Sequence, residues 1–213
     1  MALRIPLYQL DVFAERLFTG NPAAVCPLQA WLPDATMQAI AAENNLSETA
    51  FFVADETGEA DFLLRWFTPT VEVELCGHAT LASGHVVLEA LAWPRDRVCF
   101  RTLKAGVLQV ERGALGLWLD LPARPPQALE QIPAGLPEAL GAQPVQVLQQ
   151  GGYWLVVYDS ARTIEGLRPD IAALRRLPAQ AICVTAPGRR RSEDFVSRFF
   201  APALGVDEDP VTG

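Results

Sequence analysis

Apolar and polar residues alternate along many short segments of the chain, as expected for β-strands that bury one face. Two of these segments, at residues 49–53 and 62–67, are rich in aromatic and aliphatic side chains. The pattern predicts strands at residues 6–13, 23–26, 49–53, 62–67, 98–102, 107–111, 115–121, 145–148, 154–158, 182–185 and 195–200. Because strands dominate and few helices separate them, the sequence predicts an α+β fold rather than a doubly wound parallel sheet.

Three helices are expected, at residues 34–44, 77–93 and 170–177. Asp34 stands where it could cap the first of them. The second contains a single acid, Glu89, and is otherwise small or apolar on nearly every side. We expect such a helix to be buried on most sides, and strands wrapped around it would achieve this.

The run Pro122–Pro126 reads as a linker because three of its five residues are proline. It divides the chain into an expected N-terminal domain, residues 1–121, which contains the buried helix, and a C-terminal domain, residues 122–213.

A short internal repeat links the two domains. Arg65–Pro69 resembles Arg198–Pro202, and each copy is followed by an acidic, valine-containing stretch that reaches a glycine, Gly77 or Gly213. The second copy is three residues longer between its proline and its glycine. If the repeat is real, Gly213 should open a second buried helix, so we expect the chain to be a piece of a longer protein with an incomplete second domain.

Composition narrows the functional class. Half of the 213 residues are hydrophobic and the formal net charge is −8. An acidic chain repels nucleic acid and anionic membranes, so neither is an expected partner. No segment reaches the roughly 20 apolar residues of a membrane span. The start of the chain lacks a secretion signal, and we expect a cytoplasmic protein.

The four cysteines, Cys26, Cys76, Cys99 and Cys183, form no Cys-x-x-Cys pair and have no histidine at metal-ligand spacing. We therefore expect reduced thiols and no bound metal. The sequence also lacks a phosphate loop, a dinucleotide motif and a nucleophile elbow, so no cofactor is expected.

Two histidines, His78 and His85, lie on the expected buried helix. His85 lies within its apolar part and is expected to be a hydrogen-bonded core residue. His78 follows Gly77 at the start of the helix, where unpaired backbone N–H groups and the helix dipole favour a carboxylate or phosphate. Cys76 precedes them, and this position can lower the pKa of a thiol. Alternatively, Cys76 is a small packing residue.

Two acids are further candidates. Glu48 directly precedes an apolar strand, where burial would raise the pKa of its carboxyl and suit it to acid/base chemistry near neutral pH. The alternative is a capping or turn acid. Asp209 lies in an acidic run close to Gly213, the counterpart of the Gly77 site, and the alternative there is a solvated loop.

Six segments, in order, resemble the motif set of the PhzF-like (phenazine biosynthesis-like) family. They are Asp11–Phe13, Phe18–Val25, Leu46–Phe51, Arg65–Val73, Cys76–Thr80 and Asp209–Gly213. The resemblance implies a diaminopimelate-epimerase-like fold, in which two similar domains each wrap a barrel-like sheet around a central helix, with the active site between them. Residues 122–192 contribute little to this resemblance.

The same resemblance implies roles for individual residues. Glu48 would take and return a proton, His78 would position the substrate or relay the proton, and Asp209 would contact the substrate from the other domain. The positions expected to border a substrate carboxylate are Cys76, Gly77, Thr212 and Gly213. The phenazine enzyme itself isomerises a dihydro-hydroxyanthranilate by moving a proton along a diene, without metal or nucleotide. Homodimers are frequent in the family.

The leading hypothesis is therefore a cofactor-independent isomerase acting on a small carboxylate-bearing metabolite. A second hypothesis is an amino-acid racemase or epimerase of the same fold. Cofactor-free racemases use two opposed cysteines, and the position that matches Cys76 in the second copy is Thr212, which counts against it. A third hypothesis is a small-molecule binding protein without catalytic activity.

Overall fold

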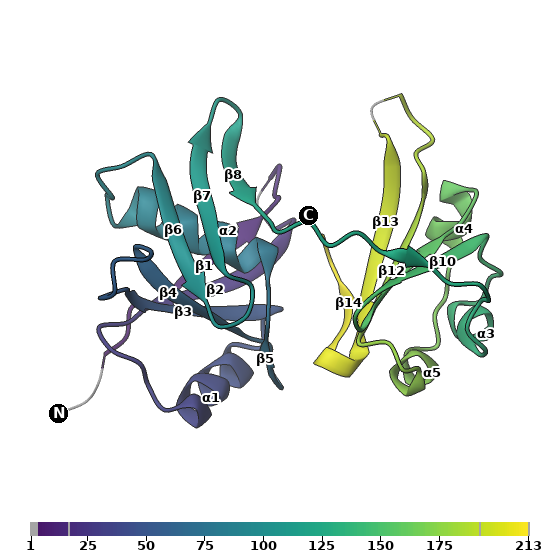
Figure 1. Cartoon of the computed structure of the whole chain (residues 1–213), viewed down its shortest axis with the longest axis horizontal. Helices are drawn as coiled ribbons and strands as arrows, with labels where there is room; N and C mark the ends of the chain where they lie inside the picture. Colours follow the sequence, from purple (N-terminus) through teal and green to yellow (C-terminus); the bar gives the residue numbers. More distant parts are fainter. Residues whose placement is uncertain (1–3, 17, 192, 213) are drawn as a thin grey trace. The chain divides into compact units, whose positions relative to one another are not determined.

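The computed structural model describes residues 4–16, 18–191 and 193–212 (Figure 1). The chain forms two compact units, of which the first ends at Pro122 and the second comprises Ala123–Thr212. Each unit is built on a sheet of its own. None of the described helices is long and apolar enough to cross a membrane.

The first unit is an eight-stranded sheet that curls around a helix (Figure 1). Its strands are β1 (Tyr8–Val12), β2 (Asn21–Pro27), β3 (Glu48–Ala54), β4 (Phe62–Phe67), β5 (Glu72–Val73), β6 (Arg97–Thr102), β7 (Val107–Gly113) and β8 (Gly116–Asp120). They follow the order β1-β2-β3-β4-β6-β7-β8, with β5 paired to β4. The pairs β2–β3 and β4–β6 are parallel and the other pairs are antiparallel.

The helix inside this sheet is α2 (Gly77–His85), which a π-helical turn, η1 (Val86–Ala90), extends. It contacts β1, β2, β3, β7 and β8. A Cβ atom added at Gly84 would lie 2.4 Å from Val110 Cγ1 of β7, so helix and strand can approach this closely only because the residue is glycine. The expectation of a buried central helix is confirmed.

The expectation for His85 is wrong, because this residue is exposed. Leu81, His85 and Glu89 follow one another at intervals of four residues and form the least buried stripe of the helix. The apolar run that surrounds His85 in the sequence belongs to the other faces of the helix, which pack on the sheet.

The other helix of the first unit, α1 (Asp34–Asn44), packs on the outer face of the sheet through Met37 and Ala41. It ends at Asn45, whose left-handed backbone (φ 49°) stops the helix. Asp34 is not its N-cap as expected. Pro33 occupies that position, and the Asp34 carboxylate instead accepts a hydrogen bond from Arg65 Nη1 at 2.8 Å.

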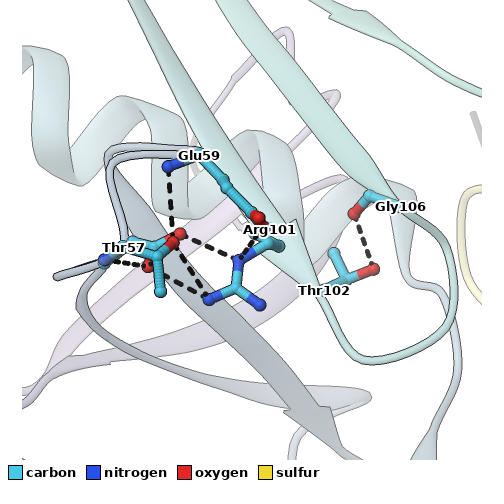
Figure 2. A network of polar contacts seen from close by, with 6 residues as sticks. Thr57, Glu59, Arg101, Thr102 and Gly106 are labelled. Atoms are coloured by element: carbon cyan, nitrogen blue, oxygen red, sulfur yellow. Dashed lines mark hydrogen bonds and ion pairs between the residues drawn. The ribbon is translucent and has the colours of Figure 1, made fainter.

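A cluster of polar side chains lies at the C-terminal end of β3 (Figure 2). Arg101 of β6 donates from Nε and Nη2 to the Asp55 carboxylate at 2.9 and 3.0 Å, and its Nε lies 3.4 Å from Glu59 Oε2. Thr57 donates to the same carboxylate from its hydroxyl at 2.7 Å. Since β4 lies between β3 and β6, this cluster ties together the two strands that flank β4.

The second unit has a six-stranded sheet in the order β14-β13-β12-β11-β10-β9. Its strands are β9 (Gln127–Ala128), β10 (Gln146–Gln150), β11 (Tyr153–Val157), β12 (Ala181–Pro187), β13 (Phe195–Ala201) and β14 (Val206–Asp209). Its helical segments are α3 (Leu136–Leu140), α4 (Ala161–Gly166), α5 (Ile171–Arg176) and the 3₁₀ turn η2 (Pro202–Leu204). Within Ala123–Thr212, apart from position 192, no helix is longer than six residues, so the described part of this unit has no counterpart of α2.

The strand pairing confirms the internal repeat. The series β1–β2 antiparallel, β2–β3 parallel, β3–β4 antiparallel and β4–β5 antiparallel recurs as β10–β11, β11–β12, β12–β13 and β13–β14. In the first copy Arg65 donates from Nε and Nη2 to Glu72 at 2.7 and 2.8 Å. In the second, Arg198 donates from the same two atoms to Glu208 at 2.7 and 2.9 Å. The turn η2 lies between this arginine and glutamate, where the second copy is longer.

Candidate functional site

Glu48 is the first residue of β3, in the segment that follows the left-handed end of α1. Its backbone is fixed by the parallel pairing of β2 and β3, in which Glu48 lies opposite Ala23. The side chain is 14% exposed. The structure therefore places this carboxyl in a largely buried position at the end of an apolar strand, as the sequence predicts.

His78 lies in the first turn of α2 and its side chain is 7% exposed. Its Nε2 is 3.2 Å from Glu48 Oε2. Cys76 precedes the helix in an extended conformation, and its Sγ lies 3.5 Å from His78 Nδ1. A carboxyl, an imidazole and a thiol are thus brought together where the buried helix begins.

A fourth polar side chain completes this group and was missed by the sequence analysis. Asn21, the first residue of β2, is fully buried, and its Nδ2 lies 3.4 Å from His78 Nδ1. Asn21 lies between Gly20 and Pro22, and this combination of residues is typical of a turn rather than of a buried site. The available signal was a polar side chain at the start of the apolar strand Ala23–Cys26, where a buried amide needs a partner.

The side chains that could hold a metal ion in the described residues are three members of this group, Glu48, Cys76 and His78, whose ligand atoms lie within 4.8 Å of one another. A mixed set of sulfur, nitrogen and oxygen ligands suits zinc. The same atoms also face one another at the distances of a polar network, with Asn21 Nδ2 directed at the imidazole nitrogen that faces the thiol.

The remaining predicted site residues fall into two groups. Gly77 is the first residue of α2, so its N–H is one of the unpaired donors at the helix start. In the second unit, Thr212 Oγ1 donates to Asp209 Oδ2 at 2.6 Å. The structure therefore brings Asp209 and Thr212 together, whereas Gly213 lies outside the described residues.

The repeat allows the two copies of the site positions to be compared. Phe51 pairs with Arg65 in the first copy and Val184 pairs with Arg198 in the second, so Glu48 corresponds to Ala181. The β2–β3 and β11–β12 registers likewise make Asn21 correspond to Gly151. Thr212 takes the place of Cys76. The second copy therefore lacks the carboxyl, the carboxamide and the thiol that the first copy carries at these three positions.

The fold and this site define the class of protein: an α+β chain of duplicated half-barrels that carries an acid, an imidazole and a thiol at the start of a buried helix. The chain belongs to the family of phenazine biosynthesis-like proteins, PhzC-PhzF, which it matches over residues 10–213.

Relatives show the extent of this similarity. An uncharacterized isomerase of Pseudomonas aeruginosa is 50% identical over 211 residues, which are 99% of this chain and 78% of that protein. The crystal structure of a PhzF family protein of Enterococcus faecalis superposes with a TM-score of 0.85 at 41% identity, covering 98% of this chain and 78% of that one. A hydroxyproline epimerase of Agrobacterium vitis shares the fold, with a TM-score of 0.58 at 12% identity, over 97% of this chain and 72% of that one.

Proposed function

We propose that this protein is a cofactor-independent isomerase that moves a proton on a small carboxylate-bearing metabolite, with Glu48 as the acid/base. The observation that carries the proposal is the 3.2 Å approach of Glu48 Oε2 to His78 Nε2 in a largely buried position. Relatives at 50% and 40% identity are named isomerases, which supports the same class of reaction.

The proposed chemistry follows from the groups at the site. The Glu48 carboxylate takes a proton from a saturated carbon next to a double bond that is conjugated with the substrate carboxylate, and the electron pair of the broken C–H bond delocalises into that conjugated system. The resulting Glu48 carboxylic acid returns the proton at another carbon, so no net proton, oxidant or reductant is required. The N–H groups at the start of α2 suit the substrate carboxylate, because preorganised donors stabilise the charge that develops on it.

His78 contributes to this proposal as the partner of the acid. An imidazole next to a carboxylate can accept or donate a proton near neutral pH, whereas a guanidinium would hold the carboxylate permanently ionised. The pair therefore suits a carboxyl that must alternate between its two protonation states during each turnover.

Solvent deuterium incorporation tests the reaction class. The protein is incubated in D₂O with a panel of 2-amino carboxylates, 2-hydroxy carboxylates and diene carboxylates, including a dihydro-hydroxyanthranilate, and the products are analysed by NMR. We expect deuterium together with a shifted double bond. Label at an inverted stereocentre would instead indicate a racemase or epimerase. Ligand-induced stabilisation without any label across the panel would indicate a binding protein and contradict the proposal.

A further inference from the structure

Two polar side chains lie next to one nitrogen of His78. Asn21 Nδ2 lies 3.4 Å from Nδ1 and Cys76 Sγ lies 3.5 Å from the same atom. The other ring nitrogen, Nε2, faces Glu48 Oε2 at 3.2 Å. The two nitrogens of this imidazole therefore have different partners, and the nature of those partners determines where the ring carries its hydrogen.

The carboxamide nitrogen next to Nδ1 favours one of the two tautomers. A carboxamide NH₂ group donates two hydrogen bonds and accepts none, so Asn21 Nδ2 can bind Nδ1 only when Nδ1 presents its lone pair. A neutral imidazole with a lone pair on Nδ1 carries its hydrogen on Nε2, which is the nitrogen that faces the Glu48 carboxylate. An imidazolium, with hydrogens on both nitrogens, would place Nδ1–H against the N–H of Asn21.

The same reasoning applies to the thiol. With a lone pair on Nδ1, Cys76 can contribute its S–H as a second, weak donor. Transfer of the thiol proton to Nδ1 would give a thiolate beside an imidazolium, the arrangement of cysteine nucleophiles. Asn21 opposes that transfer, because the resulting Nδ1–H would meet the N–H of the carboxamide.

We propose that Asn21 is a positioning residue that holds His78 as the neutral tautomer with its hydrogen on Nε2 and thereby keeps Cys76 a thiol. The carboxyl of Glu48, rather than the sulfur of Cys76, is then the group that handles the proton. The catalytic part of this inference rests on the proposed function, but the tautomer itself does not.

The chain around Asn21 is built to keep the carboxamide in place. Gly20 has a left-handed backbone (φ 90°), and a Cβ there would lie 2.4 Å from the carbonyl oxygen of Val12. Pro22 restricts the residue before it to extended conformations, and Asn21 pairs with Val12 across β1 and β2. The full burial of Asn21 further limits its rotation. The amide is therefore preorganised rather than recruited by a substrate.

Nitrogen-15 NMR of the imidazole side chains tests the tautomer directly. The chain contains two histidines, His78 and His85, so the spectrum is simple, and His85→Gln assigns the remaining ring to His78. At about pH 8, above the usual histidine pKa of about 6.5, we expect a protonated Nε2 and an unprotonated Nδ1 in the parent protein. A protonated Nδ1 would overturn the proposal, whether it arises from the other tautomer or from a reversed Asn21 amide.

Asn21→Asp provides the second test, because it keeps the shape of the side chain and replaces the donor by an acceptor. We expect the hydrogen of His78 to move to Nδ1 and the rate of deuterium incorporation to fall by about a hundredfold or more, the usual range for an impaired acid/base group. An unchanged tautomer in this variant would also overturn the proposal. If the Asn21→Asp variant does not fold, the spectrum of the parent protein alone tests the proposed tautomer of His78.

Asn44→Asp is the matched control. Asn44 also belongs to the first unit and donates from Nδ2 to Thr49 Oγ1 at 3.1 Å, next to Glu48 in the sequence. The Asn44→Asp substitution introduces the same charge at a residue that hydrogen-bonds Thr49 rather than the imidazole, and we expect the His78 tautomer to be retained. If the tautomer responds as expected but no compound of the panel incorporates deuterium, the proposed function fails while the role of Asn21 stands.

Discussion

At the scale of the residue, Glu48 is distinguished by its partner. Asp55 and Asp61 are also largely buried, with side chains 0% and 13% exposed, but each forms an ion pair with an arginine. Glu48 faces an imidazole instead. Because an imidazole titrates near neutral pH and a guanidinium does not, Glu48 has the partner that suits reversible proton transfer.

Substitution of Cys76 distinguishes carboxylate chemistry from thiol chemistry. Cys76→Ser keeps a small donor beside His78 Nδ1 but removes the sulfur. We expect deuterium incorporation to stay within about tenfold of the parent rate, whereas loss of an essential acid/base group costs 10²–10⁴-fold. Cys26→Ser is the matched control, since burial raises the pKa of the Cys26 thiol to about 11 and Cys26 does not belong to the site. A loss of a hundredfold or more in Cys76→Ser alone would favour the racemase hypothesis.

At the scale of the element, β3 carries the acid at one end and is held at the other. Asp55 follows its last residue and binds Arg101, and hydrogen bonds from Arg101 and then from Thr57 hold the pKa of the Asp55 carboxyl well below its usual range (Figure 2). A group with a lowered folded-state pKa stabilises the fold above its unfolded pKa of about 3.9, and this contribution is lost as the pH falls through the folded-state pKa.

We expect Asp55→Asn to lower the melting temperature at neutral pH, because it removes the charge that Arg101 binds. The difference from the parent should shrink as the pH falls below about 4. Thermal unfolding across this pH range provides the measurement. Asp96→Asn is the control, since the Asp96 side chain is 90% exposed and its contact with Arg112 is 3.4 Å long. If the difference in melting temperature between the parent and Asp55→Asn stays constant down to about pH 2, the Asp55 carboxylate does not stabilise the fold through its charge.

The longer strands and helices could be predicted from the sequence because each contains several repeats of its own period, whereas the short strands β5, β9 and β14 could not. The short helices α3 and α4 were also missed, since five or six residues make fewer than two turns; α5 is equally short but begins at the capping residue Asp170, and it was expected. The exposure of His85 was mispredicted for a related reason. Composition alone showed that the helix is apolar, but not which of its narrow stripes the sheet leaves uncovered.

The candidate site shows the same limit. Glu48, Cys76 and His78 could be selected because their residue types and local positions suggest chemistry. Asn21 was missed although it stands at the start of an apolar strand, because its contact with His78 joins residues 57 positions apart and depends on the wrapping of β2 around α2. The assignment of roles to Asp209, Thr212 and Gly213 still rests on resemblance to the family.

At the scale of the whole molecule, the chain is a duplication in which one copy carries the acid. The strand order and the arginine–glutamate pairs are retained in both copies, whereas Glu48 and Asn21 correspond to Ala181 and Gly151. The duplicated scaffold is therefore common to both units and the acid/base group is not. Any catalytic contribution of the second unit must come from other residues, and Asp209 and Thr212 are its candidates.

Asp209→Asn tests that contribution. If Asp209 contacts the substrate, we expect the rate of deuterium incorporation to fall by about tenfold or more, since a hydrogen bond to a charged group contributes about 1.5–3 kcal/mol. Asp207→Asn on the same strand is the control, because Asp207 pairs with the exposed Arg175. Equal rates for both variants and the parent would remove Asp209 from the site without affecting the proposal for Glu48.

The central claim is that Glu48 transfers the proton, and the rate of deuterium incorporation by Glu48→Gln tests it most directly. The amide keeps the size of the side chain but cannot take a proton from carbon, so we expect the rate to fall by about 10²–10⁴-fold while the melting temperature changes little. Glu43→Gln, on the exposed face of α1, makes the same substitution outside the site and should match the parent. A Glu48→Gln protein that incorporates deuterium at the parent rate would contradict the account.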